Sequence, residues 1–221
     1  MQKEIKKYRL KLTKKDELRF ISHLDWQSLI LKVFRRTGIN LVLSEGFNKM
    51  PKVSYSPALP IFIESDCELV NFQTYDNLNE SFIELFNSNS PDGAQVTAFF
   101  EQNPNEPKSL ENYIQWASYR AKFKNHVYNL EQIRYIIEKC LSSGEFLITK
   151  KTKKGIDKEV NYRKSLKSLQ YEGDELLFTL KAGQNELIPA LRADEFLKIL
   201  FNGAQFSIKR TGFFDVDFEE I

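Results

Sequence analysis

Acid–base chemistry has one clear candidate in this sequence, His23, which stands directly after Ser22 and two residues before Asp25. An imidazole titrates near neutral pH and can act as a general acid or base. The same three residues predict the start of a helix, with Ser22 as the N-cap and Asp25 placed as in a capping box. A helix N-terminus disfavours a protonated imidazole, so catalysis, ligand contact and a purely structural role all remain open for His23.

A second group of candidate residues lies between positions 44 and 54 and combines lysines, hydroxyls, a carboxylate and a phenyl ring. Gly46 permits a tight turn within it. An exposed Phe47 would stack on a base while the lysines hold phosphates. The alternative is a structural loop with Phe47 buried. The predicted ligand- or RNA-contacting residues of this part of the chain are Ser22, Asp25, Ser44, Glu45, Phe47, Lys49, Lys52 and Ser54, with Arg19, Arg35 and Arg36 nearby in sequence.

A third candidate is the basic stretch at residues 150–167, which holds eight lysines and arginines against two acidic residues. Gly155 predicts a turn, as at the tip of a hairpin. Such a stretch is a suitable electrostatic arm for RNA, although a solvated run of lysines has the same composition. The predicted contacts are Lys150, Lys151, Lys153, Lys154 and Arg163.

The charge of the 221-residue chain is segregated along the sequence. The net charge is +2 overall, but +8 over residues 1–52, −9 over residues 53–107 and +3 over residues 108–221. This pattern allows a basic face that attracts a polyanion. It is equally compatible with two patches that neutralise each other in the fold. No apolar run reaches the roughly 20 residues needed to span a bilayer. The two isolated cysteines predict a reducing, cytoplasmic location, and their spacing predicts no metal site.

Hydrophobic periodicity predicts the order β-α-β-β-α-β in the first half of the chain. The first helix is expected to begin at Ser22 and to end at Gly38. The second helix is expected to be capped by Asn77 together with Glu80. The expected strands are Tyr8–Leu12, Ile39–Leu43, Glu68–Thr74 and Ala94–Phe100, with a long shaped loop over residues 44–60.

The second half repeats this order, with helices capped by Asn129 and starting near Arg192. Its expected strands are Tyr119–Phe123, Phe146–Lys150, Leu176–Lys181 and Phe206–Arg210. A polar segment with two prolines at residues 102–107 is expected to link the halves. The fold class is therefore predicted as α+β, with tandem ferredoxin-like domains at residues 1–104 and 108–221 and antiparallel sheets.

Several short motifs resemble those of a known bacterial family. They are Leu18–Asp25, Arg35–Gly38, Ser44–Asn48, Pro51–Ser54 and, in the second half, Val160–Arg163. They are similar to the radical-SAM-linked domain family of unknown function, whose members occur alone or fused to radical SAM proteins. The resemblance implies a context in RNA metabolism and radical SAM chemistry, but no reaction. Where the family often has a loop histidine, this chain has Met50, which weakens any mechanism that needs a second histidine beside His23.

The sequence therefore favours a non-catalytic RNA-binding or substrate-presenting module that holds tRNA or rRNA for a partner, such as a radical SAM enzyme. The chain has no cysteine triplet for a radical SAM cluster, and no cofactor is expected. One alternative is a metal-independent ribonuclease, with His23 as the general base and Lys49 or Lys52 stabilising the developing phosphate charge. Another is a protein-interaction module that docks a basic partner on the acidic residues 53–107.

Overall fold

The structure is a computed structural model that describes residues 4–103, 106, 109–125, 127–151, 155, 157–183 and 188–221. The chain divides into two compact units, residues 1–114 and 115–221. Both are mixed α+β units with antiparallel strands. The sequence placed the boundary at residues 104–108, whereas the short helix α3 (Leu110–Tyr113), with Leu110 fully buried, falls within the first unit.

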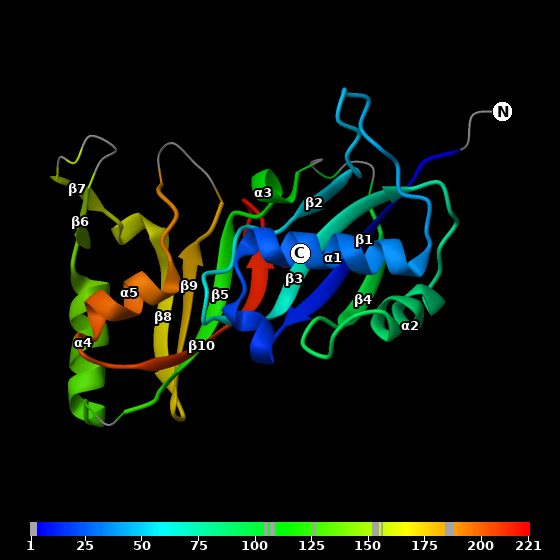
Figure 1. Ribbon diagram of the computed structural model, residues 1–221. Helices are drawn as coiled ribbons and strands as arrows, with labels where there is room; N and C mark the ends of the chain where they lie inside the picture. Colours follow the sequence, from blue (N-terminus) through cyan, green and yellow to red (C-terminus); the bar gives the residue numbers. More distant parts are fainter. Residues whose placement is uncertain are drawn as a thin grey trace. The chain divides into compact units, whose positions relative to one another are not determined.

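The first unit is a four-stranded antiparallel sheet in the order β4-β1-β3-β2. Helices α1 and α2 lie on one face of this sheet (Figure 1). In chain order the elements are β1 (Lys6–Lys14), the 3-10 helix η1 (Asp16–Phe20), α1 (His23–Thr37), β2 (Val53–Tyr55), β3 (Glu64–Thr74), α2 (Ser81–Ser88), β4 (Val96–Glu101) and α3.

Strand β1 shows why this sheet has two different faces. Its apolar residues Tyr8, Leu10 and Leu12 are buried in the core with the helices. Because successive side chains of a strand point to opposite faces, the alternating residues, such as Arg9, lie on the other face. Arg9 pairs in register with Asn71 of β3 and Phe100 of β4, and Asn71 pairs with Ser54 of β2. The face away from the helices is therefore rich in polar side chains.

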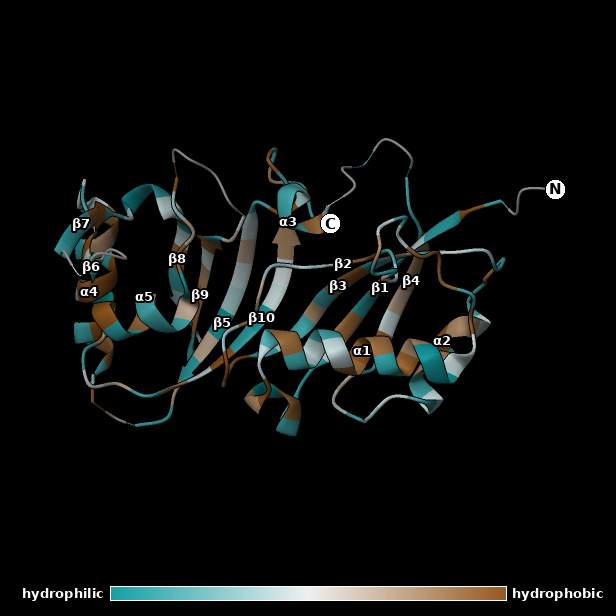
Figure 2. Cartoon of the chain, turned by 45° about the horizontal axis from the view of Figure 1, so that its top comes forward, coloured by the Kyte–Doolittle hydropathy of each residue, from teal (hydrophilic) through white to brown (hydrophobic). Residues whose placement is uncertain are grey.

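Helix α1 begins and ends where its sequence predicts. The Ser22 side chain accepts a hydrogen bond from the Asp25 backbone N–H, and Gly38 ends the helix in the left-handed conformation, with a φ of 74°. Hydrophobic and hydrophilic bands alternate along the helix in Figure 2. The buried stripe consists of Trp26, Ile30, Val33 and Phe34. Phe34 packs on the ring of Phe72 at a centroid distance of 4.8 Å, which joins the helix to β3.

Two predicted elements of the first unit are wrong. Residues 39–43 form only isolated bridges, at Leu41 and Leu43, and the strand beside β3 is instead β2, inside the predicted loop. A three-residue strand with prolines nearby gives too short an alternation to be recognised from the sequence. Asn77 is not the cap of α2: Glu80 occupies that position without a side-chain hydrogen bond.

The second unit has antiparallel strands in the order β10-β5-β9-β8, and a separate hairpin of β6 and β7. Phe146–Lys150 was predicted as a strand of the main sheet, but this segment contributes to the hairpin. The position beside β9 that was expected for it is taken by β8 (Leu166–Glu172). The elements are β5 (Trp116–Phe123), α4 (Leu130–Ser142), β6 (Leu147–Lys151), β7 (Asp157–Asn161), η2 (Arg163–Ser165), β8 (Leu166–Glu172), β9 (Glu175–Lys181), α5 (Ala193–Leu200) and β10 (Phe206–Phe214).

The helices of the second unit also follow their sequence signals. Asn129 caps α4 through a complete capping box with Gln132, as predicted for that position. Phe196 of α5 packs on Phe178 of β9 at a ring-centroid distance of 5.4 Å, so α5 covers the face of the sheet that carries Phe178. Across the described ranges, no helix is both long and apolar enough to cross a membrane.

Candidate functional site

The start of α1 uses Ser22 and Asp25 mainly for its own structure. Besides capping the helix, the Ser22 hydroxyl donates to the Asp25 carboxylate at 2.6 Å. The amide nitrogen of Gln27 lies 2.8 Å from Nε2 of His23. With the amide nitrogen as the donor, Nε2 is the acceptor of this hydrogen bond. Nε2 of His23 is therefore already occupied by a neighbour on the same helix.

Lys52 and His23 do not converge on one reacting atom. The His23 ring lies edge-on to Tyr55, at a centroid distance of 6.4 Å, and the Tyr55 hydroxyl donates to the Gln27 carbonyl of α1. Burial raises the pKa of Tyr55 far above its ordinary value, which keeps this donor protonated. Lys52 precedes Tyr55 by three positions and its carbonyl accepts from the Gln73 N–H of β3, so its side chain projects to the opposite face of the sheet.

The loop between Ser44 and Lys52 is closed by backbone hydrogen bonds and carries an exposed phenyl ring. The Ser44 N–H donates to the Met50 carbonyl at 2.8 Å, and the Met50 N–H returns a hydrogen bond to the Ser44 hydroxyl at 3.1 Å. Phe47 at the end of this loop is fully exposed to solvent. The alternative in which Phe47 is buried is therefore wrong.

A cavity of about 660 Å³ lies beside this loop. Tyr75, which is 40% exposed, provides an aromatic wall, and Glu45 and Lys49 provide opposite charges. The volume falls in the range of small-molecule pockets, roughly 300–1,000 Å³. The remaining lining residues are Asn40, Leu41, Leu43 and Ser44. The structure thus brings three of the predicted contact residues together around one hollow: Ser44, Glu45 and Lys49.

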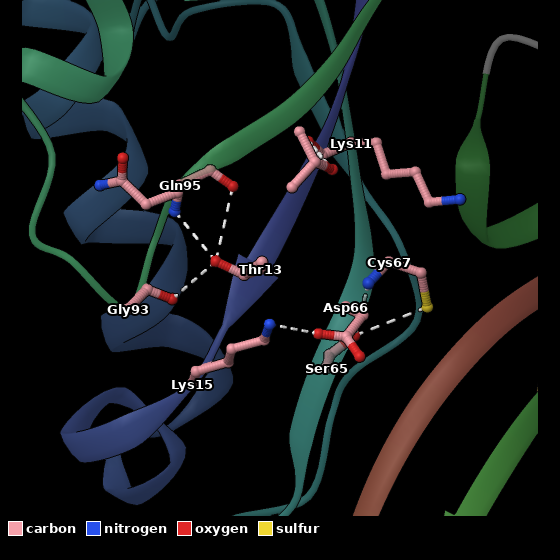
Figure 3. A network of polar contacts seen from close by, with 9 residues as sticks. Lys11, Thr13, Lys15, Ser65, Asp66, Cys67, Gly93 and Gln95 are labelled. Carbon is pink, nitrogen blue, oxygen red and sulfur yellow. Dashed lines mark hydrogen bonds and ion pairs between the residues drawn. The ribbon is translucent and has the colours of Figure 1, made fainter.

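Several cations of the N-terminal segment are ion-paired with the acidic segment of the same unit. Arg19 contacts Glu64 at 2.7 Å. Figure 3 shows Lys15 paired with Asp66, beside the hydrogen bonds that join Thr13 to Gly93 and Gln95, just before β4. Arg9, which is buried, pairs with Glu106. Three of the nine carboxylates at residues 53–107 are therefore paired with cations from residues 1–52.

The arginines at the end of α1 lie a full helix length from His23. Arg35 and Arg36 follow His23 by 12 and 13 positions, which at 1.5 Å each places them about 18–20 Å away along the axis. Arg35 is exposed, and Arg36 donates to the Asn89 carbonyl at 3.3 Å. Arg36 also lines a groove of about 610 Å³ together with Asp25 and Lys32. Asp25 and Arg36 therefore border a different hollow from that of the loop residues.

In the second unit, two of the predicted basic contacts have structural partners. Lys150 binds Glu195 of α5 at 3.1 Å and lies over the Tyr162 ring. Burial opposes its charge, but hydrogen bonds with Tyr162 and Glu195 outweigh that effect and raise the pKa of Lys150. Arg163 donates to the carbonyls of Leu141 and Ser143, each at 3.0 Å, and so closes the C-terminus of α4.

The other predicted basic residues divide by where they fall in the chain. Lys151 is exposed at the end of β6, with Gly155 in the left-handed conformation beyond it, as expected for a hairpin turn. Lys153 and Lys154 lie outside the described residues. Nothing in the described ranges brings together three or more histidine, cysteine or acidic side chains as a metal site requires.

The sequence reasoning missed three amide side chains on the sheet of the first unit. Asn71, Gln73 and Gln102 line a cavity of about 190 Å³ with Lys52 and Ser54. A signal was present, because Asn71 interrupts the apolar run of β3 between Val70 and Phe72. Its significance depends on which strands flank it, which the sequence did not provide.

Residues 7–189 match the model of a family described as an uncharacterized protein conserved in bacteria (DUF2344). The chain belongs to this family. The matched range includes the loop that carries Phe47 and the hairpin of β6 and β7. A comparison with curated proteins returned no match.

Proposed function

We propose that this DUF2344 protein is a non-catalytic RNA-binding module that acts in the cytoplasm and presents tRNA or rRNA to a modifying or processing enzyme. The observation that carries the proposal is the full exposure of Phe47 on a loop closed by hydrogen bonds, two residues from Lys49. An aromatic ring held in solvent beside a cation suits a stacked base and its phosphate.

The charges around Phe47 favour a polyanion over a basic protein. In the described part of the chain, neither Lys49 nor Lys52 takes part in an ion pair, whereas three carboxylates of the acidic segment are bound to Arg9, Lys15 and Arg19. Docking of a basic partner on residues 53–107 would have to compete with those pairs. Lys49 and Lys52, which follow the exposed ring in sequence and form no ion pair among the described residues, are better suited to a phosphate backbone.

The fold supports the same proposal by analogy. We infer that both units are variants of the ferredoxin-like fold, because the strand orders β4-β1-β3-β2 and β10-β5-β9-β8 each combine with two helices. The hairpin of β6 and β7 would then be an insertion in the second unit. RNA-recognition domains also bind single strands with a four-stranded sheet and exposed aromatic rings. This similarity concerns the arrangement alone.

The ribonuclease alternative has less support. It needs His23 and either Lys49 or Lys52 on the same phosphate. The side chain of Lys52 projects from the other face of the sheet, and Lys49 lines a cavity whose lining does not include His23. A radical SAM enzyme remains the proposed partner on the resemblance of the motifs.

The proposal is tested by Phe47→Ala, with Phe62→Ala as the matched control. Phe62 is another exposed phenyl ring of the first unit, 71% accessible and outside the loop. A base stacked on an aromatic side chain contributes about 1–3 kcal/mol, so Phe47→Ala should weaken the binding of total tRNA about 5- to 150-fold. Equal affinities of the two variants and the original protein for both tRNA and rRNA would refute the role of Phe47.

A further inference from the structure

The small cavity on the sheet of the first unit is built from hydrogen-bond donors. Among its lining residues, Asn71 and Gln73 belong to β3 and Ser54 belongs to β2. Lys52 directly precedes β2, and Gln102 directly follows β4. The alternation along β1 and β3 places Asn71 and Gln73 on the face away from α1 and α2. The cavity therefore opens on a different side of the sheet from the His23 region.

Asn71 is the central group of this cavity. It is only 4% exposed, and its Oδ1 accepts a hydrogen bond from Nε of Arg9 at 2.9 Å. That bond fixes the orientation of the amide, because the oxygen must face the arginine donor. The other side-chain atom, Nδ2, is buried and has no acceptor among the residues that the structure describes. A buried donor without an acceptor is costly and rare, so Asn71 calls for an acceptor from outside the chain.

The neighbouring groups provide further donors and a positive charge. Over the described ranges, the ammonium group of Lys52 and the amides of Gln73 and Gln102 have no side-chain hydrogen bond or ion pair. The Ser54 oxygen accepts from the Leu110 N–H at 3.1 Å, which leaves its own proton available to donate. The lining contains no carboxylate. A site with several donors, one cation and no anion favours a negatively charged group rich in acceptors.

We propose that this cavity is an oxyanion site that binds a phosphate group. Its volume of about 190 Å³ corresponds to roughly six waters at about 30 Å³ each. That space accommodates one tetrahedral phosphate. Lys52 supplies the charge, and Asn71 directs its Nδ2 protons to one phosphate oxygen. The inference does not depend on the RNA proposal, since a free phosphate or a phosphorylated small molecule offers the same chemistry.

The test is a titration of the full chain with inorganic phosphate in a buffer free of other oxyanions, at constant ionic strength, monitored by calorimetry and by amide NMR shifts. Lys52→Met is the main variant. Lys32→Met is the matched control, because it removes the same charge from an exposed position on α1. Phosphate should bind at millimolar concentrations or below, at least tenfold more weakly to Lys52→Met and with unchanged affinity to Lys32→Met.

Asn71→Leu provides the second variant, with its fold checked by circular dichroism, because the substitution also removes the acceptor of Arg9. Phosphate affinity should fall at least tenfold in this variant too. Competition with RNA identifies the source of the group: phosphate that displaces RNA indicates a backbone phosphate, and phosphate that binds without displacing RNA indicates a small ligand. Absence of phosphate binding, or equal weakening by Lys32→Met and Lys52→Met, would overturn the site, whatever the result with RNA.

Discussion

Removal of Lys49 and Lys52, which form no ion pair among the described residues, should change how RNA binding responds to salt. Each phosphate neutralised by a lysine releases counterions and contributes about 0.7–0.9 to the slope of log K against log salt. The double variant Lys49→Met, Lys52→Met should therefore reduce the magnitude of this slope by about 1.4–1.8. Between 50 and 200 mM salt, the unmodified protein would lose about 7- to 12-fold more affinity than the variant.

The assay is filter binding of tRNA at a series of potassium chloride concentrations. Lys32→Met is the control, because it removes an exposed lysine from α1 without touching the loop. Its slope should stay close to that of the unmodified protein. If the double variant and the control shift the slope equally, the attraction is diffuse and the loop has no specific role. An unchanged slope in the double variant would likewise refute the reasoning.

Three further predictions concern residues whose roles the structure makes specific. Ser22→Ala should lower the free energy of unfolding by about 1 kcal/mol through loss of the α1 cap, as denaturant titration would show, while RNA affinity stays unchanged. Arg163→Met should destabilise the protein by about 1–2 kcal/mol, because α4 loses its C-terminal donors, and should leave the salt slope of RNA binding unaltered. Burial lowers the pKa of Lys181 from 10.5, so the folded protein binds this proton less well than the unfolded chain does. The free energy of unfolding of the original protein, relative to that of Lys181→Met, should therefore increase as pH rises toward 10.5. If denaturant titrations give the same difference between the two proteins at pH 7 and at pH 10, this prediction is wrong.

Local signals in the sequence were sufficient to predict the elements whose ends are marked by capping residues. Helix α1 has a serine cap, a buried stripe and a terminal glycine, and α4 has its capping box at Asn129. The elements that failed depend on distant partners. Strand β2 is only three residues long and exists because it pairs with β3. Strand β8 escaped prediction because the register shift between Leu166 and Ser168 interrupts its alternation.

The candidate site shows the same division between local and distant information. The sequence identified Phe47 and Lys49 as a plausible contact pair, but only the structure shows that the ring is exposed. The ion pair of Arg19 with Glu64 and the hydrogen bonds of Arg163 to α4 join residues 20 or more positions apart. The cavity around Asn71 requires the register between β2 and β3, which no spacing in the sequence specifies.

The most direct test of the central claim is the binding of the unmodified protein to cellular tRNA and rRNA across a salt series, followed by a gel that reports whether the RNA is intact. We predict binding that weakens steeply with salt and leaves the RNA uncleaved. No binding even at low salt would contradict an RNA-binding role. Cleavage that persists in chelator and is lost in His23→Ala would contradict the non-catalytic part of the proposal.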